Sequence, residues 1–114
     1  MIEIIVLEHL AQELGYPVYT EEPTGPVKPA KYVLIRKAEN GPENHILHAM
    51  ILVQSYGNTM LDASYLNELA KAAMERMADR DDICRVQLNS DYNFTDTASK
   101  RYRYQAVFDV YYYD

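Results

Sequence analysis

The chain has 114 residues, of which 48% are hydrophobic and 25% charged, values typical of one globular domain spanning residues 1–114. Its 17 acidic and 11 basic residues give a formal net charge of −6, which argues against a broad surface that neutralises nucleic-acid phosphates. Cys84 is the one cysteine, so the chain cannot form an internal disulfide, and we expect a small apolar role for it in a strand.

The first element that the sequence predicts is a helix over residues 2–14. Apolar residues recur there at helical spacing, and Gly15 stands where a C-terminal cap belongs. The apolar start lacks a basic leading region and is soon followed by acidic residues, so we expect neither a signal peptide nor a membrane span. A short strand is expected at 17–19, and the three prolines within 21–29 predict a loop.

Two strands are predicted next, by a hydrophobic pattern of period two. Residues 31–38 alternate, and Asn40-Gly41-Pro42 predicts a break after them. From His45 to Tyr56 both faces are largely apolar, which is typical of a central strand.

A second helix is predicted over residues 63–77, with Thr59 and Asp62 as its capping signal and Lys71 with Glu75 as an exposed ion pair. Residues 83–90 then predict a strand, and the polar stretch 90–99 predicts a loop. On the strand, one set of side chains is expected to point inward: Cys84, Val86 and Leu88.

The last strand, over residues 100–114, is rich in tyrosine. Tyr102, Tyr104, Phe108 and Val110 fall on one face and are expected to anchor the core. The opposite face is too apolar for a surface that meets only water, so we expect partner contacts there. The residues predicted to make those contacts are Arg101, Arg103, Tyr111 and Tyr113.

These elements predict a two-layer α+β fold with a mostly antiparallel sheet of four to five strands. Both amphipathic helices bury their apolar stripes most simply on one face of the sheet. The other face is then uncovered, and a homo-oligomer is the expected way to cover it.

No catalytic or metal-binding pattern stands out, so we expect no enzyme, metal or cofactor. His45 and His48 are three apart on a strand and point to opposite faces, and His9 has no partner ligand at suitable spacing. The acidic run Asp79, Asp81 and Asp82, with Glu75, is read as a solvated helix end. No serine lies in a Gly-x-Ser-x-Gly turn, and no glycine-rich loop could hold phosphates.

The segment from Lys100 to Tyr104 alternates bases with tyrosines, as single-stranded nucleic-acid platforms do. On a strand the arginines and tyrosines face opposite ways, so we do not expect sequence-specific nucleic-acid binding. Arg101 and Arg103 are instead expected to meet acids of a neighbouring subunit, for which Glu21, Glu22 and Asp91 are the candidates.

The order of these elements resembles the tail-terminator and tail-completion proteins, minor tail proteins of long-tailed bacteriophages. Four features carry the resemblance: the N-terminal helix, the approach Pro26-Val27-Lys28-Pro29-Ala30-Lys31-Tyr32-Val33-Leu34-Ile35 with the long strand Ala49 to Tyr56, the helix Ala63 to Met77, and the closing pattern that begins at Arg101-Tyr102. None is a fingerprint by itself; the resemblance lies in their order and spacing.

This resemblance implies a homohexameric ring that caps the tail tube, stops its polymerisation and offers a docking surface to the head. The implied partners are the tail-tube protein and head–tail connector proteins, with DNA passing through the ring and no membrane involved. The implied location is the host cytoplasm during assembly of the phage or prophage particle, and afterwards the tail of the virion.

Two alternatives remain open at this stage. One is another neck or head-closure protein of the same virion. The other is a small α+β enzyme or ligand-binding oligomer whose pocket is lined by His48, Tyr56 and Arg101.

Overall fold

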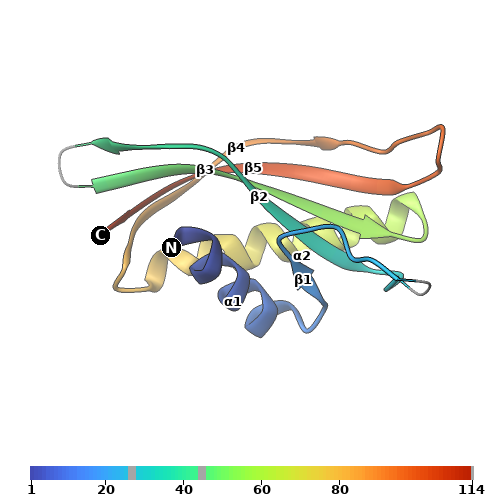
Figure 1. Cartoon of the computed structure of the whole chain (residues 1–114), viewed down its shortest axis with the longest axis horizontal. Coiled ribbons are helices and arrows are strands. Elements are labelled where there is room, and N and C mark those ends of the chain that lie inside the picture. The colour runs from blue at the N-terminus through green and yellow to red at the C-terminus, as the bar shows by residue number, and fades with distance from the viewer. Residues whose placement is uncertain (26–27, 44–45, 114) are drawn as a thin grey trace.

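The computed structural model describes residues 1–25, 28–43 and 46–113, and it contains two α-helices packed on a five-stranded sheet (Figure 1). In chain order the elements are α1 (Ile2–Leu14), β1 (Val18–Tyr19), β2 (Tyr32–Glu43), β3 (Ile46–Gly57), α2 (Met60–Arg76), the 3-10 turn η1 (Met77–Asp79), β4 (Ile83–Asn93) and β5 (Tyr102–Tyr113).

The strand order in the sheet is β1-β2-β3-β5-β4. The short β1 pairs with β2 in parallel, and the other three pairings are antiparallel. The tyrosine-rich β5 therefore lies inside the sheet, hydrogen-bonded on both edges, and it can meet a partner only through its side chains. β4 forms one edge of the sheet.

Both helices cover the same face of the sheet, which confirms the predicted two-layer α+β fold (Figure 1). The core between the layers is apolar and closely packed. Its largest fully buried side chains are Ile2, Leu10, Ile35, Ile51, Leu66, Met74, Met77 and Phe108.

The predicted caps Gly15 and Thr59 are confirmed, although α2 spans Met60–Arg76 and not the predicted residues 63–77. Gly15 ends α1 in the left-handed backbone conformation, with φ 72°. Residues that carry a side chain rarely adopt this conformation. Thr59 caps α2 by accepting a hydrogen bond from the Asp62 amide at 3.1 Å. Just before it, Gly57 passes so close to α2 that a Cβ there would lie 2.6 Å from the Ala63 amide nitrogen.

Several sequence-based predictions of strand limits were wrong. β2 does not break at Asn40-Gly41-Pro42 but continues to Glu43, paired with β3 except at an irregularity between Lys37 and Glu39. β4 extends into the predicted loop as far as Asn93, because β5 pairs with it along its whole length. The predicted strand start at His45 lies outside the described residues.

The predicted inward row of β4 was also wrong in part. The register shifts between Ile83 and Arg85 and again between Leu88 and Ser90. At the first irregularity Cys84 is exposed, and Leu88 is 44% exposed near the second. Val86 alone of the three predicted inward residues packs against the core.

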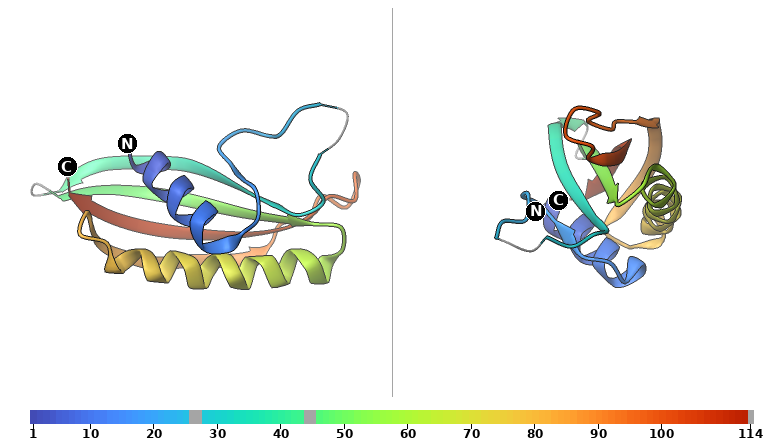
Figure 2. Two further views of the ribbon diagram at one scale, coloured as in Figure 1. Left: turned by 90° about the horizontal axis from the view of Figure 1, so that it is seen from below. Right: turned by 90° about the vertical axis from the view of Figure 1, so that its right-hand side faces the viewer.

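The sheet is twisted and curved rather than flat, as the end-on view shows (Figure 2). Part of the face that the helices leave uncovered, which we call the helix-free face, is buried by its own side chains. Leu34 on that face has no exposed surface, and it forms a second apolar cluster with Tyr32, Tyr56 and the neighbouring Tyr19. The expectation of a fully uncovered apolar face therefore needs correction.

Candidate interaction surface

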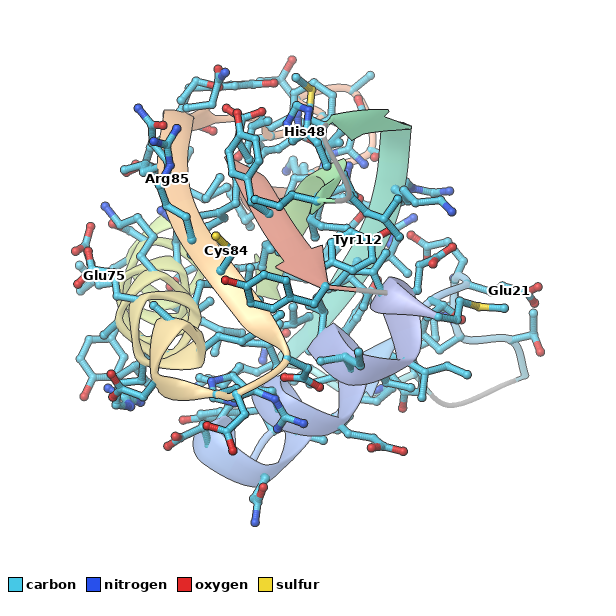
Figure 3. The ribbon with its side chains drawn as sticks, turned by 90° about the vertical axis from the view of Figure 1, so that its left-hand side faces the viewer. Glu21, His48, Glu75, Cys84, Arg85 and Tyr112 are labelled. Carbon is cyan, nitrogen blue, oxygen red and sulfur yellow. The ribbon has the colours of Figure 1, made fainter. Side chains whose placement is uncertain are left out.

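Strand alternation places the side chains of Arg103 and Tyr111 on the helix-free face of β5, with Arg101 leading into the strand. Figure 3, viewed from the end that carries both termini, shows His48 and Arg85 on this side and Tyr112 on the side of the helices. The face holds three groups of polar contacts, which follow one another along the sheet.

The first group centres on Arg101. One guanidinium nitrogen, Nη2, lies 3.0 Å from both carboxylate oxygens of Glu22 and donates to the Tyr32 hydroxyl at 2.6 Å. The guanidinium also stacks over the Tyr56 ring, 5.0 Å from its centroid. Arg101 and Glu22, which were predicted to meet across a subunit boundary, are thus already paired within one chain.

This pairing changes the acidity of the groups involved. Burial alone would raise the pKa of Glu22, but the hydrogen bonds and positive charge of Arg101 outweigh it and hold that pKa below its ordinary value. Burial raises the pKa of Tyr32 to about 12, although the charge of Arg101 opposes the shift. The phenol therefore stays protonated and can donate to Glu22, whose Oε2 lies 3.3 Å away.

Arg103 belongs to the same end of the sheet and ties three segments together. Its Nε donates to the Phe94 carbonyl at 2.7 Å, and Nη1 donates to the Tyr56 hydroxyl at 3.1 Å. The guanidinium lies 4.4 Å from the centroid of the Phe94 ring, within cation–π range. Arg103 thus links the segment after β4 to β3 and β5. Its guanidinium is only partly available to a partner.

The second group is a polar line across β3, β5 and β4. Gln54 donates to Gln105 at 2.7 Å, and Gln105 in turn donates to the Tyr92 hydroxyl. Both glutamines are nearly buried, at 6% and 4% exposure, so their paired amides avoid the cost of unsatisfied polar groups. Sequence reasoning missed this line, because only the register brings its members together.

The third group lies toward the end that carries the termini. His48 Nε2 lies 2.9 Å from Asp109 Oδ1, and Asn89 donates to the other carboxylate oxygen at 3.1 Å. Tyr111 stacks on His48 with ring centroids 4.5 Å apart, and Arg85 lies 4.7 Å from the Tyr111 centroid. Burial would raise the pKa of Asp109, but the hydrogen bonds from His48 and Asn89 prevail and lower it.

Two predicted contact residues stand outside these groups. Tyr113 is 49% exposed at the end of β5, and Glu21 is exposed on the loop after β1, where Figure 3 shows it directed away from the sheet. Among the described residues Glu21 forms no side-chain hydrogen bond or ion pair, and Tyr113 meets the Cys84 thiol, which raises the pKa of the Tyr113 phenol. Of the six predicted interface residues, these two are the freest to meet a partner.

Asp91, the third acid predicted to pair with those arginines on a neighbouring subunit, lies on the other face of β4 and binds α2. It accepts hydrogen bonds from Asn67 at 2.7 Å and from Lys71 at 2.5 Å. Lys71 also lies 2.8 Å from Glu68, so the predicted pair with Glu75 was wrong. Asp91 is therefore a clamp between α2 and the sheet.

The predicted ligand pocket of His48, Tyr56 and Arg101 does not assemble. Tyr56 and Arg101 line an open hollow of about 320 Å³ at the end of the molecule, together with Lys28, Lys100 and Tyr102. His48 lies eight residues from Tyr56 along β3, a separation of roughly 26 Å for an extended strand. The described residues therefore form no pocket shared by His48, Tyr56 and Arg101, which is the feature that would have favoured a ligand-binding oligomer.

No group of three potential metal ligands occurs among the described residues. The described helices include none that is long and apolar enough to cross a membrane. His9, one of the metal candidates weighed above, is instead buried between the helices, with Nε2 2.7 Å from the Ala73 carbonyl oxygen.

The fold of this chain is similar to that of a solved structure. No protein-family model and no curated protein matches the sequence. Among solved structures, a chain from the structure titled "Virion of native gene transfer agent (GTA) particle" superposes with a TM-score of 0.57 and 16% sequence identity. The match covers 94% of this chain and 90% of the other. At that identity the comparison establishes a shared fold over almost the whole chain.

Proposed function

We propose that the chain is a structural, non-enzymatic subunit of a phage-like virion, of the tail-terminator type. Copies would form a ring, hexameric by the family resemblance, that caps the tail tube and joins it to the head. Assembly would take place in the host cytoplasm, after which the ring stays in the tail of the particle.

The observation that carries this proposal is the likeness of fold to a chain of a gene transfer agent virion, over 94% of this chain. The likeness covers both helices and the sheet, so it does not rest on a single common motif. It agrees with the order of elements that led independently to the tail-terminator resemblance.

The helix-free face supports a role in assembly. It carries stacked tyrosines, arginines and paired amides along three strands, a composition that is common at protein interfaces. Arg103, Tyr111 and Tyr113 with Glu21 are the residues proposed to contact neighbouring subunits or the tube. Arg101 and Glu22 would serve such contacts indirectly, by holding the loop before β2 against the sheet.

Deletion of the gene from the phage or prophage that encodes it tests the proposal. Loss of a tail terminator should give over-long tails without heads, as seen by negative-stain electron microscopy. Tails of normal length beside separate filled heads would indicate another neck or head-closure protein. Particles of normal form and number would contradict both roles.

A further inference from the structure

The hollow at the end of the sheet combines three cations with three aromatic side chains. It is built from the loop before β2, the end of β3 and the start of β5, and its charged and aromatic lining consists of Lys28, Lys100, Arg101, Tyr32, Tyr56 and Tyr102. No acidic residue belongs to the described lining, but Glu22 pairs with Arg101 beside it, so the uncompensated positive charge comes from Lys28 and Lys100. The chain as a whole has a net charge of −6, so the positive charge of this hollow is opposite in sign to that of the whole molecule.

The backbone presents one of these cations in a strained conformation. Lys100 has φ 56°, the left-handed region, and among the described residues it is the one non-glycine there. Residues other than glycine rarely adopt this region, because their Cβ crowds the backbone there. The turn is held by reciprocal backbone hydrogen bonds between Asp96 and Arg101, at 3.2 and 3.1 Å. The turn thereby places Lys100 at the edge of the hollow.

Arg101 lies at the base of the hollow in a fixed orientation, since Glu22 and Tyr32 hold one of its nitrogens. Lys28 and Lys100 are exposed, and neither forms an ion pair with a described residue. The wall also includes Gly57 and Asn58, which precede the capped N-terminus of α2, where the helix dipole favours negative charge. The hollow is therefore suited to carboxylates.

The opposite end of the molecule carries a complementary group. The longest dimension is 43 Å, and the turn between η1 and β4 lies at the other end of it (Figure 1). Asp79 and Asp81 are exposed on this turn, while Asp82 is held by Arg80 at 3.1 Å. The turn thus presents two carboxylates at the end opposite the cations.

We infer that the hollow receives the Asp79–Asp82 turn of a second copy of this chain, so that copies associate head to tail. The pairing joins two different surfaces of the subunit, and such a contact forms a ring when the rotation between copies closes. Lys28 and Lys100 meet Asp79 and Asp81 at the rim, over the stacked tyrosines. The inference rests on the proposed function, for which it supplies a subunit contact.

Charge reversal at either end tests this contact in the full-length protein. The basic-end variant carries Lys28→Glu and Lys100→Glu, and the acidic-end variant carries Asp79→Lys and Asp81→Lys. Each is followed by sedimentation velocity at low salt, where ion pairs are least screened. Each variant alone should lose all species larger than a monomer, while an equal mixture should recover them, because the reversed ends again complement one another.

Glu8→Lys, an exposed change on α1 away from both ends, serves as the control and should assemble as the wild type does. Thermal melts must show that every variant is folded. A monomeric wild type, variants that assemble alone, or a mixture that stays monomeric would each overturn the inference. Rings that the reversals leave intact would refute this contact alone, whereas absence of the protein from virions would refute the proposed function.

Discussion

Arg103 offers a quantitative test of how the helix-free face is held together. Arg103→Ala removes two hydrogen bonds from a charged donor, to the Phe94 carbonyl and the Tyr56 hydroxyl, and a cation–π contact with the Phe94 ring. At a partly exposed site, each bond contributes about 0.5–1 kcal/mol and the cation–π contact about 0.5 kcal/mol. We therefore expect the free energy of unfolding to fall by about 2 kcal/mol.

Urea unfolding followed by circular dichroism measures this loss. With a slope of about 1.5 kcal/mol/M for a chain of this size, the midpoint should fall by roughly 1 M. Arg36→Ala is the matched control, because Arg36 is exposed on β2 and makes no described ion pair or cation–π contact. If the urea midpoint of Arg103→Ala equalled that of the control, the conclusion that Arg103 stabilises the fold through these contacts would be refuted.

Three further predictions concern packing, assembly and pH. Gly57→Ala should lower stability by about 3 kcal/mol in the same urea assay, because the new Cβ would lie 2.6 Å from a backbone nitrogen of α2; a change below about 1 kcal/mol would contradict the close approach. Tyr113→Asp should reduce assembly in sedimentation experiments. It should change the free energy of unfolding by less than about 0.5 kcal/mol, since the side chain is half exposed. A large loss of stability would show that Tyr113 supports the fold and not a subunit contact. Because the pKa of Glu22 is lowered from 4.5, its stabilisation is present above that pH and is lost as the pH falls through the folded-state value. The stability difference between wild type and Glu22→Gln should therefore shrink below pH 4.5, and a pH-independent difference would count against the Arg101 pairing.

Much of the fold was predictable because its signals are local. The period of the apolar residues and the caps Gly15 and Thr59 placed both helices, and period-two alternation placed the two faces of β5. The limits of β2 and β4 were less predictable, since they depend on pairing with a partner strand. Polar residues such as those after Ser90 pair as well as apolar ones when β5 lies beside them.

The candidate surface was predictable only in outline. Alternation assigned Arg101, Arg103 and Tyr111 to the helix-free face, but the sequence left open which of the candidate acids binds Arg101 and did not indicate that this acid, Glu22, belongs to the same chain. The Glu22 and Arg101 side chains meet across 79 positions, and the hollow combines segments from three parts of the chain. Contacts of this kind depend on strand order and register, which hydrophobic periodicity does not encode.

The most direct test of the virion role is to locate the protein in purified particles from a strain that encodes it. Gold-labelled antibodies against the chain, viewed by electron microscopy, should mark the top of the tail where it meets the head. Peptides of the chain should also appear in the mass spectrum of the same preparation. Particles that lack both the label and the peptides would contradict the proposal that this chain is a structural component of the tail.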